Sequence, residues 1–317
     1  MTKKDGFSHP FLNILDQSQN YIDNIISARV RGDNMYQIED LSYRYSRNRE
    51  DTIRGISFQI KKGEIFGLLG PSGVGKSTSQ KLLIKLLRGY EGRILYKGRD
   101  LKACKEDYFD EIGVGFEMPV HFSKLTGEEN LNFFKKLYKR TIDTDKLLKR
   151  LGLYGDKDKR VMEYSKGMKV RLNFVRAMLN NPEVLFLDEP TNGLDPKNAR
   201  IIKELIGEFR QGGGTVLLTT HLMNDVDELC DRVAFMAGGK IVETSSPKEL
   251  KLKYGRRELD LEYEDGGTIV KSSFELDGLN NPSFLDIIRN KKIITIHSKE
   301  NTLDDIFIEV TEVKGHD

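Results

Sequence analysis

A glycine-rich segment between an apolar run and a helical pattern constrains this chain more than any other feature. Residues 70–78 read Gly-Pro-Ser-Gly-Val-Gly-Lys-Ser-Thr and directly follow the continuously apolar run 65–69. Such a run predicts a strand buried on both faces, and the leucines within residues 82–87 fall on one face of a following helix. A strand, a glycine-rich turn and a helix in this order form the context that a phosphate-binding loop requires.

The loop matches the pattern G-x-x-x-x-G-K-[S/T] through Gly70, Gly75, Lys76 and Ser77. Glycines let the backbone form a nest of N–H groups that point at phosphate oxygens, and the helix N-terminus adds about half a positive charge. Lys76 can reach the β- and γ-phosphates, and Ser77 can ligate Mg²⁺. The residues expected to contact the nucleotide are Gly70, Pro71, Ser72, Gly73, Val74, Gly75, Lys76, Ser77 and Thr78.

A second element places two carboxylates at the end of a buried strand. Residues 184–187 read Val-Leu-Phe-Leu and are followed by Asp188 and Glu189. Ligands of open α/β sheets bind beyond the carboxyl ends of the strands, so both acids are expected near the loop. Asp188 is predicted to hold Mg²⁺ through water, and Glu189 to polarise the attacking water as a general base.

The rest of the chain alternates between strand and helix patterns. Strands are predicted at residues 184–187, 215–219 and 232–236, with helices at 196–210 and 223–230, which indicates a parallel α/β sheet. No apolar run exceeds roughly seven residues, whereas a membrane span needs about twenty. We therefore do not expect the chain to cross a membrane by itself.

Charge and cysteine content narrow the class of partner and the compartment. Fifty-one Lys and Arg residues against 49 Asp and Glu leave a net charge of +2, which argues against a nucleic-acid partner. Cys104 and Cys230 cannot form a disulfide framework, which favours a reduced cytoplasmic setting.

Further motifs follow in an order that resembles the ATP-binding cassette (ABC) ATPases over about residues 36–255. Residues 164–168 (Tyr-Ser-Lys-Gly-Met) stand at the family signature, and residues 192–196 (Asn-Gly-Leu-Asp-Pro) resemble the D-loop. His221 follows a strand and resembles the switch histidine. Tyr45 stands where the family places an aromatic side chain that stacks on adenine.

This resemblance implies a fold and a set of site roles. The fold is an α/β P-loop NTPase (RecA-like) core with a parallel sheet, an antiparallel β subdomain, a helical signature subdomain and a small α+β C-terminal domain. Ser165, Gly167 and Asp195 would complete the nucleotide pocket of a second copy, so that a homodimer encloses two ATP molecules. His221 would bind the γ-phosphate and hold Glu189 in place.

One position departs from the family pattern near the chemistry. Glu117 follows residues 112–116 where the family has glutamine. A glutamine amide donates and accepts hydrogen bonds, whereas an ionised carboxylate only accepts. Glu117 can ligate Mg²⁺, yet it brings negative charge to the γ-phosphate. The signature also differs, with tyrosine, lysine and methionine in place of three common residues, while Ser165 and Gly167 are kept.

The patterns divide the chain into three parts. Residues 1–34 are predicted to form an N-terminal extension with an amphipathic helix, and residues 35–255 the ATPase domain, with a helical subdomain at about 122–181. Residues 256–317 are predicted to form a small α+β domain, in which a helix over 303–310 is opened by residue 301 or 302.

The motif set favours the ATP-hydrolysing subunit of an ABC transporter. Residues 301–307 and 225–233 resemble segments of drug and small-molecule exporters, whose ATPase subunits pair with a separate membrane permease at the inner face of the cell membrane. Two alternatives stay open at this point. One is a non-transport cassette ATPase that acts on ribosomes or DNA, and the other is a cassette that binds ATP but is impaired in hydrolysis.

Overall fold

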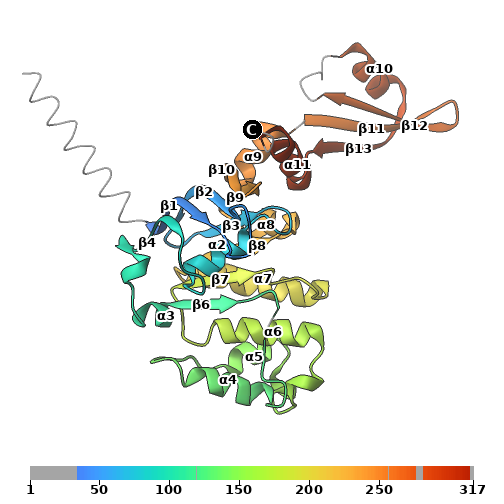
Figure 1. Ribbon diagram of the computed structural model, residues 1–317. Helices are drawn as coiled ribbons and strands as arrows, with labels where there is room; N and C mark the ends of the chain where they lie inside the picture. Colours follow the sequence, from blue (N-terminus) through green and yellow to red (C-terminus); the bar gives the residue numbers. More distant parts are fainter. Residues whose placement is uncertain (1–33, 119, 256, 276–280, 315–317) are drawn as a thin grey trace, which may run out of the picture.

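The computed structural model describes residues 34–118, 120–255, 257–275 and 281–314 (Figure 1). The predicted N-terminal amphipathic helix lies outside these residues. Within the described ranges, no helix is both long and apolar enough to span a bilayer.

A six-stranded sheet lies at the centre of the molecule, in the order β10-β9-β3-β8-β7-β6. Strands β9 to β6 pair in parallel, and β10 pairs antiparallel to β9. The central strands β3, β8 and β7 are buried along their whole length, so the predicted parallel core is confirmed. The strands are β3 (Ile65–Leu69), β6 (Ile112–Gly115), β7 (Val184–Asp188), β8 (Thr215–Thr220), β9 (Arg232–Ala237) and β10 (Lys240–Ser245).

An antiparallel sheet packs against one side of this core, in the order β2-β1-β4-β5. Buried side chains of both sheets share one apolar cluster, in which the Tyr36 ring meets the Phe186 ring edge-on at 5.7 Å. This sheet is the predicted antiparallel β subdomain. Its strands are β1 (Asn34–Tyr43), β2 (Ile53–Lys61), β4 (Glu91–Tyr96) and β5 (Arg99–Asp100).

Helices cover the central sheet and form a further layer beyond β6 (Figure 1). Thr126 caps the first helix of that layer through a capping box with Glu129, which satisfies two backbone donors. Leu131 and Leu172 of this layer are buried in the same cluster as the core strands. The helices are α3 (Asp107–Glu111), α4 (Gly127–Lys135), α5 (Asp145–Arg150), α6 (Lys166–Ala177), α7 (Pro196–Gln211), α8 (Met223–Leu229) and α9 (Pro247–Tyr254), with short 3₁₀ turns at Leu101–Ala103, Tyr154–Asp156 and Val161–Glu163.

The helix after the glycine-rich loop is shorter than its leucine pattern predicts. Helix α2 spans Lys76–Leu83 and stops before Leu87. Lys85 adopts a φ of 59°, which an α-helix does not accommodate, and Leu86 is 60% exposed. The apolar stripe therefore continues as a turn, in which Leu86 is exposed and Leu87 packs against the core.

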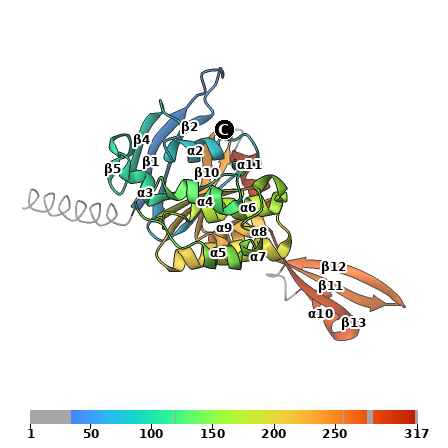
Figure 2. The same cartoon turned by 90° about the horizontal axis from the view of Figure 1, so that it is seen from below.

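The predicted C-terminal domain is divided in space (Figures 1 and 2). A three-stranded sheet, in the order β12-β11-β13, extends from the body and shares a small core with α10. The last helix, α11 (Leu303–Lys314), returns to the ATPase core, where Leu303, Ile306 and Val310 are buried. The apolar stripe of α11 is thus buried against the ATPase core and not against the small sheet. The outer elements are β11 (Arg257–Asp265), β12 (Thr268–Glu275), α10 (Pro282–Asn290) and β13 (Lys292–Glu300).

Candidate functional site

The glycine-rich loop needs its glycines because other backbone lies against it. A Cβ on Gly70 would sit 2.6 Å from the carbonyl oxygen of Met236, closer than any real side chain tolerates. Gly75 caps α2 with a φ of 114°, which favours glycine. The residues between them, Pro71, Ser72 and Gly73, are exposed, so a ligand can reach their backbone.

Lys76 lies folded over this loop. Its Nζ donates to the carbonyl oxygens of Gly70 at 2.6 Å and Pro71 at 3.1 Å, and the residue is buried. Burial lowers the pKa of Lys76, while the charges of Glu189, Asp188 and Glu117 oppose that shift. The three predicted acidic residues thus lie near enough to Lys76 for their charges to act on its ammonium group.

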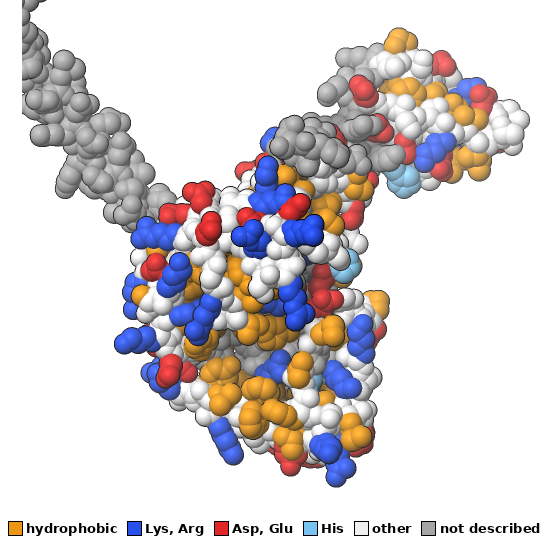
Figure 3. Space-filling model, viewed as in Figure 1, with side chains coloured by type: hydrophobic (Ala, Val, Ile, Leu, Met, Phe, Trp, Pro, Cys, Tyr) orange, Lys and Arg blue, Asp and Glu red, His pale blue; other side chains and the backbone are white. Residues whose placement is uncertain are grey.

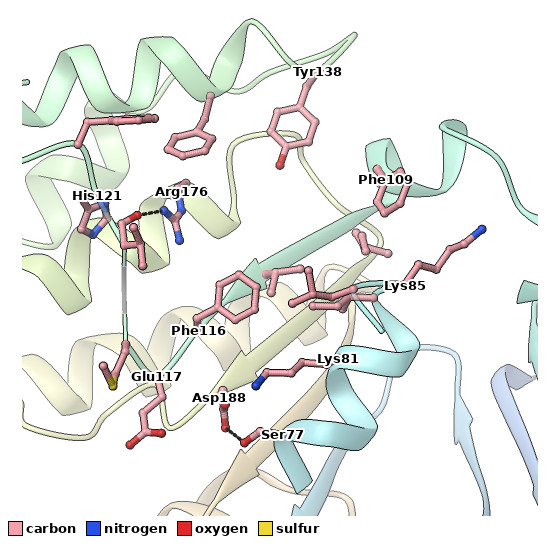
Figure 4. A pocket seen from close by; sticks show the side chains of 18 residues that line it. Ser77, Lys81, Lys85, Phe109, Phe116, Glu117, His121, Tyr138, Arg176 and Asp188 are labelled. Atoms are coloured by element: carbon pink, nitrogen blue, oxygen red, sulfur yellow. Dashed lines mark hydrogen bonds between the residues drawn. The ribbon is translucent and has the colours of Figure 1, made fainter. Parts of the chain in front are cut away.

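Oxygen atoms that suit a magnesium ion meet at the start of α2. Ser77 Oγ lies 3.4 Å from Asp188 Oδ1, which also accepts a hydrogen bond from the Thr219 hydroxyl. A hydroxyl and a carboxylate are hard donors of the kind that Mg²⁺ prefers. Glu117 lines the same cavity as Ser77 and Asp188 (Figure 4). Among the described residues, no three or more His, Cys, Asp or Glu side chains converge as a metal site.

Glu189 is held by two donors from the end of β8. Its Oε1 lies 2.7 Å from His221 Nδ1, and its Oε2 accepts from the Thr220 hydroxyl at 3.0 Å. Glu189 is buried and has a φ of 49°, an unusual conformation for a side chain of this size. Strained residues persist where their surroundings fix them, and they cluster at active sites.

Thr220 was not a sequence-based candidate. Its hydroxyl donates to Glu189 and accepts from the Leu222 N–H at 3.0 Å. The one local signal is the pair Thr219 and Thr220, which ends the strand next to His221. Only the parallel pairing of β7 with β8 brings that hydroxyl to the carboxylate.

Tyr45 lies beside the helix that follows the loop. Its hydroxyl is 3.2 Å from Thr78 Oγ1, and its ring meets the Tyr43 ring edge-on at 5.0 Å. The predicted adenine-stacking residue therefore adjoins the phosphate-binding segment.

Ser165, Gly167 and Asp195 form a separate group at the starts of two helices. Ser165 caps α6 by accepting from the Met168 N–H at 3.2 Å, and Asp195 caps α7 by accepting from the Asn198 N–H at 3.0 Å. Hydrogen bonds from the Asn198 side chain and backbone lower the pKa of Asp195. In the described chain, no hydrogen bond joins this group to residues 70–78.

A broad apolar groove opens next to Ser77, Asp188 and Glu117, between the core and the helical layer. Its volume is about 930 Å³. Hydrophobic side chains gather on this face of the molecule (Figure 3), and Met118 and Val120 are each 80% exposed. The charged end of the groove holds Ser77, Asp188 and Glu117 (Figure 4). The other side chains that line it are Lys81, Ile84, Lys85, Leu86, Phe109, Ile112, Val114, Phe116, Met118, Val120, His121, Phe122, Phe134, Tyr138 and Arg176.

Comparisons with known proteins indicate the family and the fold of the chain. A family profile described as "ABC transporter" matches residues 53–192, and one described as "Fluoroquinolone efflux ABC transporter C-terminal domain" matches residues 257–300. The fluoroquinolones export ATP-binding protein of Mycobacterium tuberculosis is 50% identical over 290 residues, which cover 90% of this chain and 96% of that protein. The linearmycin resistance ATP-binding protein LnrL of Bacillus subtilis is 32% identical and covers 85% of each chain.

A solved structure of the ATP-binding subunit of an ABC transporter has the same fold. It aligns with a TM-score of 0.68 at 24% identity, over 87% of this chain and 99% of that chain. The relatives are named for export and resistance, which favours transport over an action on ribosomes or DNA.

Proposed function

Because this chain belongs to the ABC transporter family as an ATP-binding subunit of the exporter type, we propose that Glu189 is the base for ATP hydrolysis. Members of the family hydrolyse ATP to power transport, and their ATP-binding subunits work with membrane permeases. The observation that supports Glu189 most directly is its buried carboxylate, held by His221 and Thr220 beside the loop. Residues 35–255 would form the hydrolytic unit.

The charge of the Glu189 carboxylate determines which atom carries the proton that it shares with His221. An ionised carboxylate only accepts hydrogen bonds, so the proton shared with His221 sits on Nδ1 of the imidazole. Two donors then fix both carboxylate oxygens. A water beside the γ-phosphate would give its proton to Glu189 as its oxygen attacks phosphorus, and the bond to ADP breaks. The products are ADP and inorganic phosphate.

Lys76 and the hydroxyl–carboxylate pair would hold the triphosphate. Lys76 exchanges the Gly70 and Pro71 carbonyl oxygens for phosphate oxygens. Ser77 and Asp188 offer the oxygen donors for Mg²⁺, with Glu117 as a further candidate. When bound, Mg²⁺ would neutralise charge on the phosphates. Tyr45 would stack on the adenine.

A second copy of the chain would complete the pocket. Ser165 and Asp195 are exposed at helix starts, and Gly167 lies beside the turn that leads to Asp195. Backbone N–H groups at a helix N-terminus attract phosphate. We assign these residues to the ATP bound in the opposite copy.

The apolar groove is the proposed docking surface for the membrane permease. Exposed apolar side chains gather along this groove, and contiguous apolar patches on a protein surface often mark interaction sites. Its charged end reaches Ser77 and Asp188, so a segment seated there would sense the state of the nucleotide site. Docking would place the chain at the inner face of the cell membrane.

Fluoroquinolones are the proposed cargo class. The M. tuberculosis relative is named for their export, and the match spans nearly its whole length at 50% identity. Expression of this chain with its permease should raise the inhibitory concentration of a fluoroquinolone and leave that of an unrelated antibiotic unchanged. Equal susceptibility with and without the pair would refute this cargo.

The central test is Glu189→Gln, which keeps the shape of the side chain and removes the base. We expect Mg²⁺-dependent ATP hydrolysis to fall by about a hundredfold or more, while ATP affinity is retained. The matched control is Glu183→Gln, an exposed acid just before β7 that pairs with Lys97. Hydrolysis by the Glu189→Gln protein at the parent rate would refute the assignment.

A further inference from the structure

A largely buried polar cluster of Thr191, Asp225 and Lys203 lies close in sequence to the catalytic pair Glu189 and His221. The Thr191 hydroxyl donates to Asp225 Oδ2, and Lys203 Nζ lies 3.5 Å from Asp225 Oδ1. Thr191 is 5% exposed, and the side chains of Asp225 and Lys203 are 13% and 16% exposed. Lys203 also pairs with Glu228. Such burial of charge is favourable only where partners satisfy it, and here each partner is present.

The cluster connects the two loops that carry the chemistry. Thr191 follows Glu189 in a turn closed by the hydrogen bond from the Asn192 N–H to the Glu189 carbonyl at 3.1 Å. Asp225 lies in the first turn of α8, four residues after His221. Lys203 comes from α7, which packs on α8. The Thr191–Asp225 bond therefore joins the same two loops as the Glu189–His221 contact, at a second point.

His221 needs such an anchor. Its side chain is 53% exposed, so packing does not fix the ring, and its position depends on the backbone that bears it. The residue that caps α8, Leu222, makes no side-chain cap bond. What holds the start of α8 near Glu189 is the Thr220 hydroxyl on one side and the Thr191–Asp225 bond on the other.

We propose that Asp225 is a positioning residue, which acts with Thr191 and Lys203 to hold the His221 ring in hydrogen-bond contact with Glu189. This inference rests on the proposed roles of Glu189 and His221. A misplacement on the order of 1 Å costs a catalytic step up to about a hundredfold. Loss of the Thr191–Asp225 bond or of the Asp225–Lys203 pair should thus lower turnover and leave nucleotide binding intact, because in the described chain no hydrogen bond or ion pair of these three residues reaches residues 70–78.

The test uses Asp225→Asn, which removes the charge that pairs with Lys203, and Thr191→Val, which removes the hydroxyl that bonds Asp225. Thr191→Ser is the variant that keeps the hydroxyl. The matched control is Asp227→Asn, since Asp227 lies on the same helix and pairs with Lys251 away from the site. We expect kcat to fall about tenfold in the first two variants with unchanged KM for ATP. Thr191→Ser and Asp227→Asn should stay within about twofold of the parent.

A spectroscopic readout separates positioning from folding. In ¹⁵N-histidine-labelled protein, the Nδ1–H signal of His221, assigned by its loss in His221→Ala, reports the contact with Glu189. This signal should broaden or vanish in Asp225→Asn and Thr191→Val. It should persist in Thr191→Ser and in the control Asp227→Asn. A retained signal together with the parent kcat in Asp225→Asn and Thr191→Val would overturn the inference. If Glu189→Gln also hydrolyses ATP normally, the proposed function fails as well; if it is inactive, only the role of Asp225 fails.

Discussion

Thr220 offers the sharpest test of how the catalytic carboxylate is held. Thr220→Val keeps the shape of the side chain and removes the hydroxyl of a residue that is 1% exposed. Two contacts disappear together, the 3.0 Å bond to Glu189 Oε2 and the 3.0 Å bond from the Leu222 N–H. A bond to a charged group contributes about 1.5–3 kcal/mol. Leu222 is 37% exposed, so water can replace the partner that its N–H loses. We therefore expect the free energy of unfolding to drop by about 1.5–3 kcal/mol.

The same change should lower kcat. With one donor gone, the Glu189 carboxylate can rotate about its remaining contact with His221, and a tenfold loss in rate corresponds to about 1.4 kcal/mol of barrier. We expect a fall of about 10- to 100-fold, measured by phosphate release at saturating ATP, with denaturant unfolding as the companion assay. Thr220→Ser keeps the hydroxyl and should behave as the parent. Parent-like kcat in a folded Thr220→Val protein would refute the view that both oxygens must be held.

Three further expectations follow from other parts of the molecule. Glu117→Gln should keep ATP binding and raise basal hydrolysis, because it removes negative charge and supplies a donor near the γ-phosphate; loss of nucleotide binding would instead make Glu117 a metal ligand. Val120→Asp should leave hydrolysis by the isolated chain within about twofold and abolish co-purification with the permease, since it puts a charge into the apolar groove; unchanged co-purification would remove the groove from the docking surface. Burial lowers the pKa of His121 to about 4, so the folded state favours its neutral form. Stability from this source should be present above about pH 6.5 and be lost as the pH falls toward 4, and His121→Gln should flatten that part of the unfolding profile; an unaltered acid slope would contradict it.

The sequence was most informative where a feature is local. The loop and β7 could be predicted because each combines a continuous apolar run with glycines or acids at its end. The Thr191–Asp225 bond could not, since it depends on the parallel pairing of β7 with β8, which no local pattern encodes. The apolar stripe of residues 303–310 predicts a helix, but the stripe does not say which surface will bury it.

The outer sheet begins and ends at the same place, because its first strand β11 and its last strand β13 are antiparallel neighbours. Its first and last residues, Arg257 and Glu300, lie opposite each other in the ladder, while the helices before and after it both pack on the ATPase core. The chain therefore enters and leaves this module, residues 257–300, at one point, as in a domain inserted into a surface loop. A short turn could therefore replace it without moving α11. The module is thus a unit that related subunits could gain, lose or vary while the hydrolytic core stays intact.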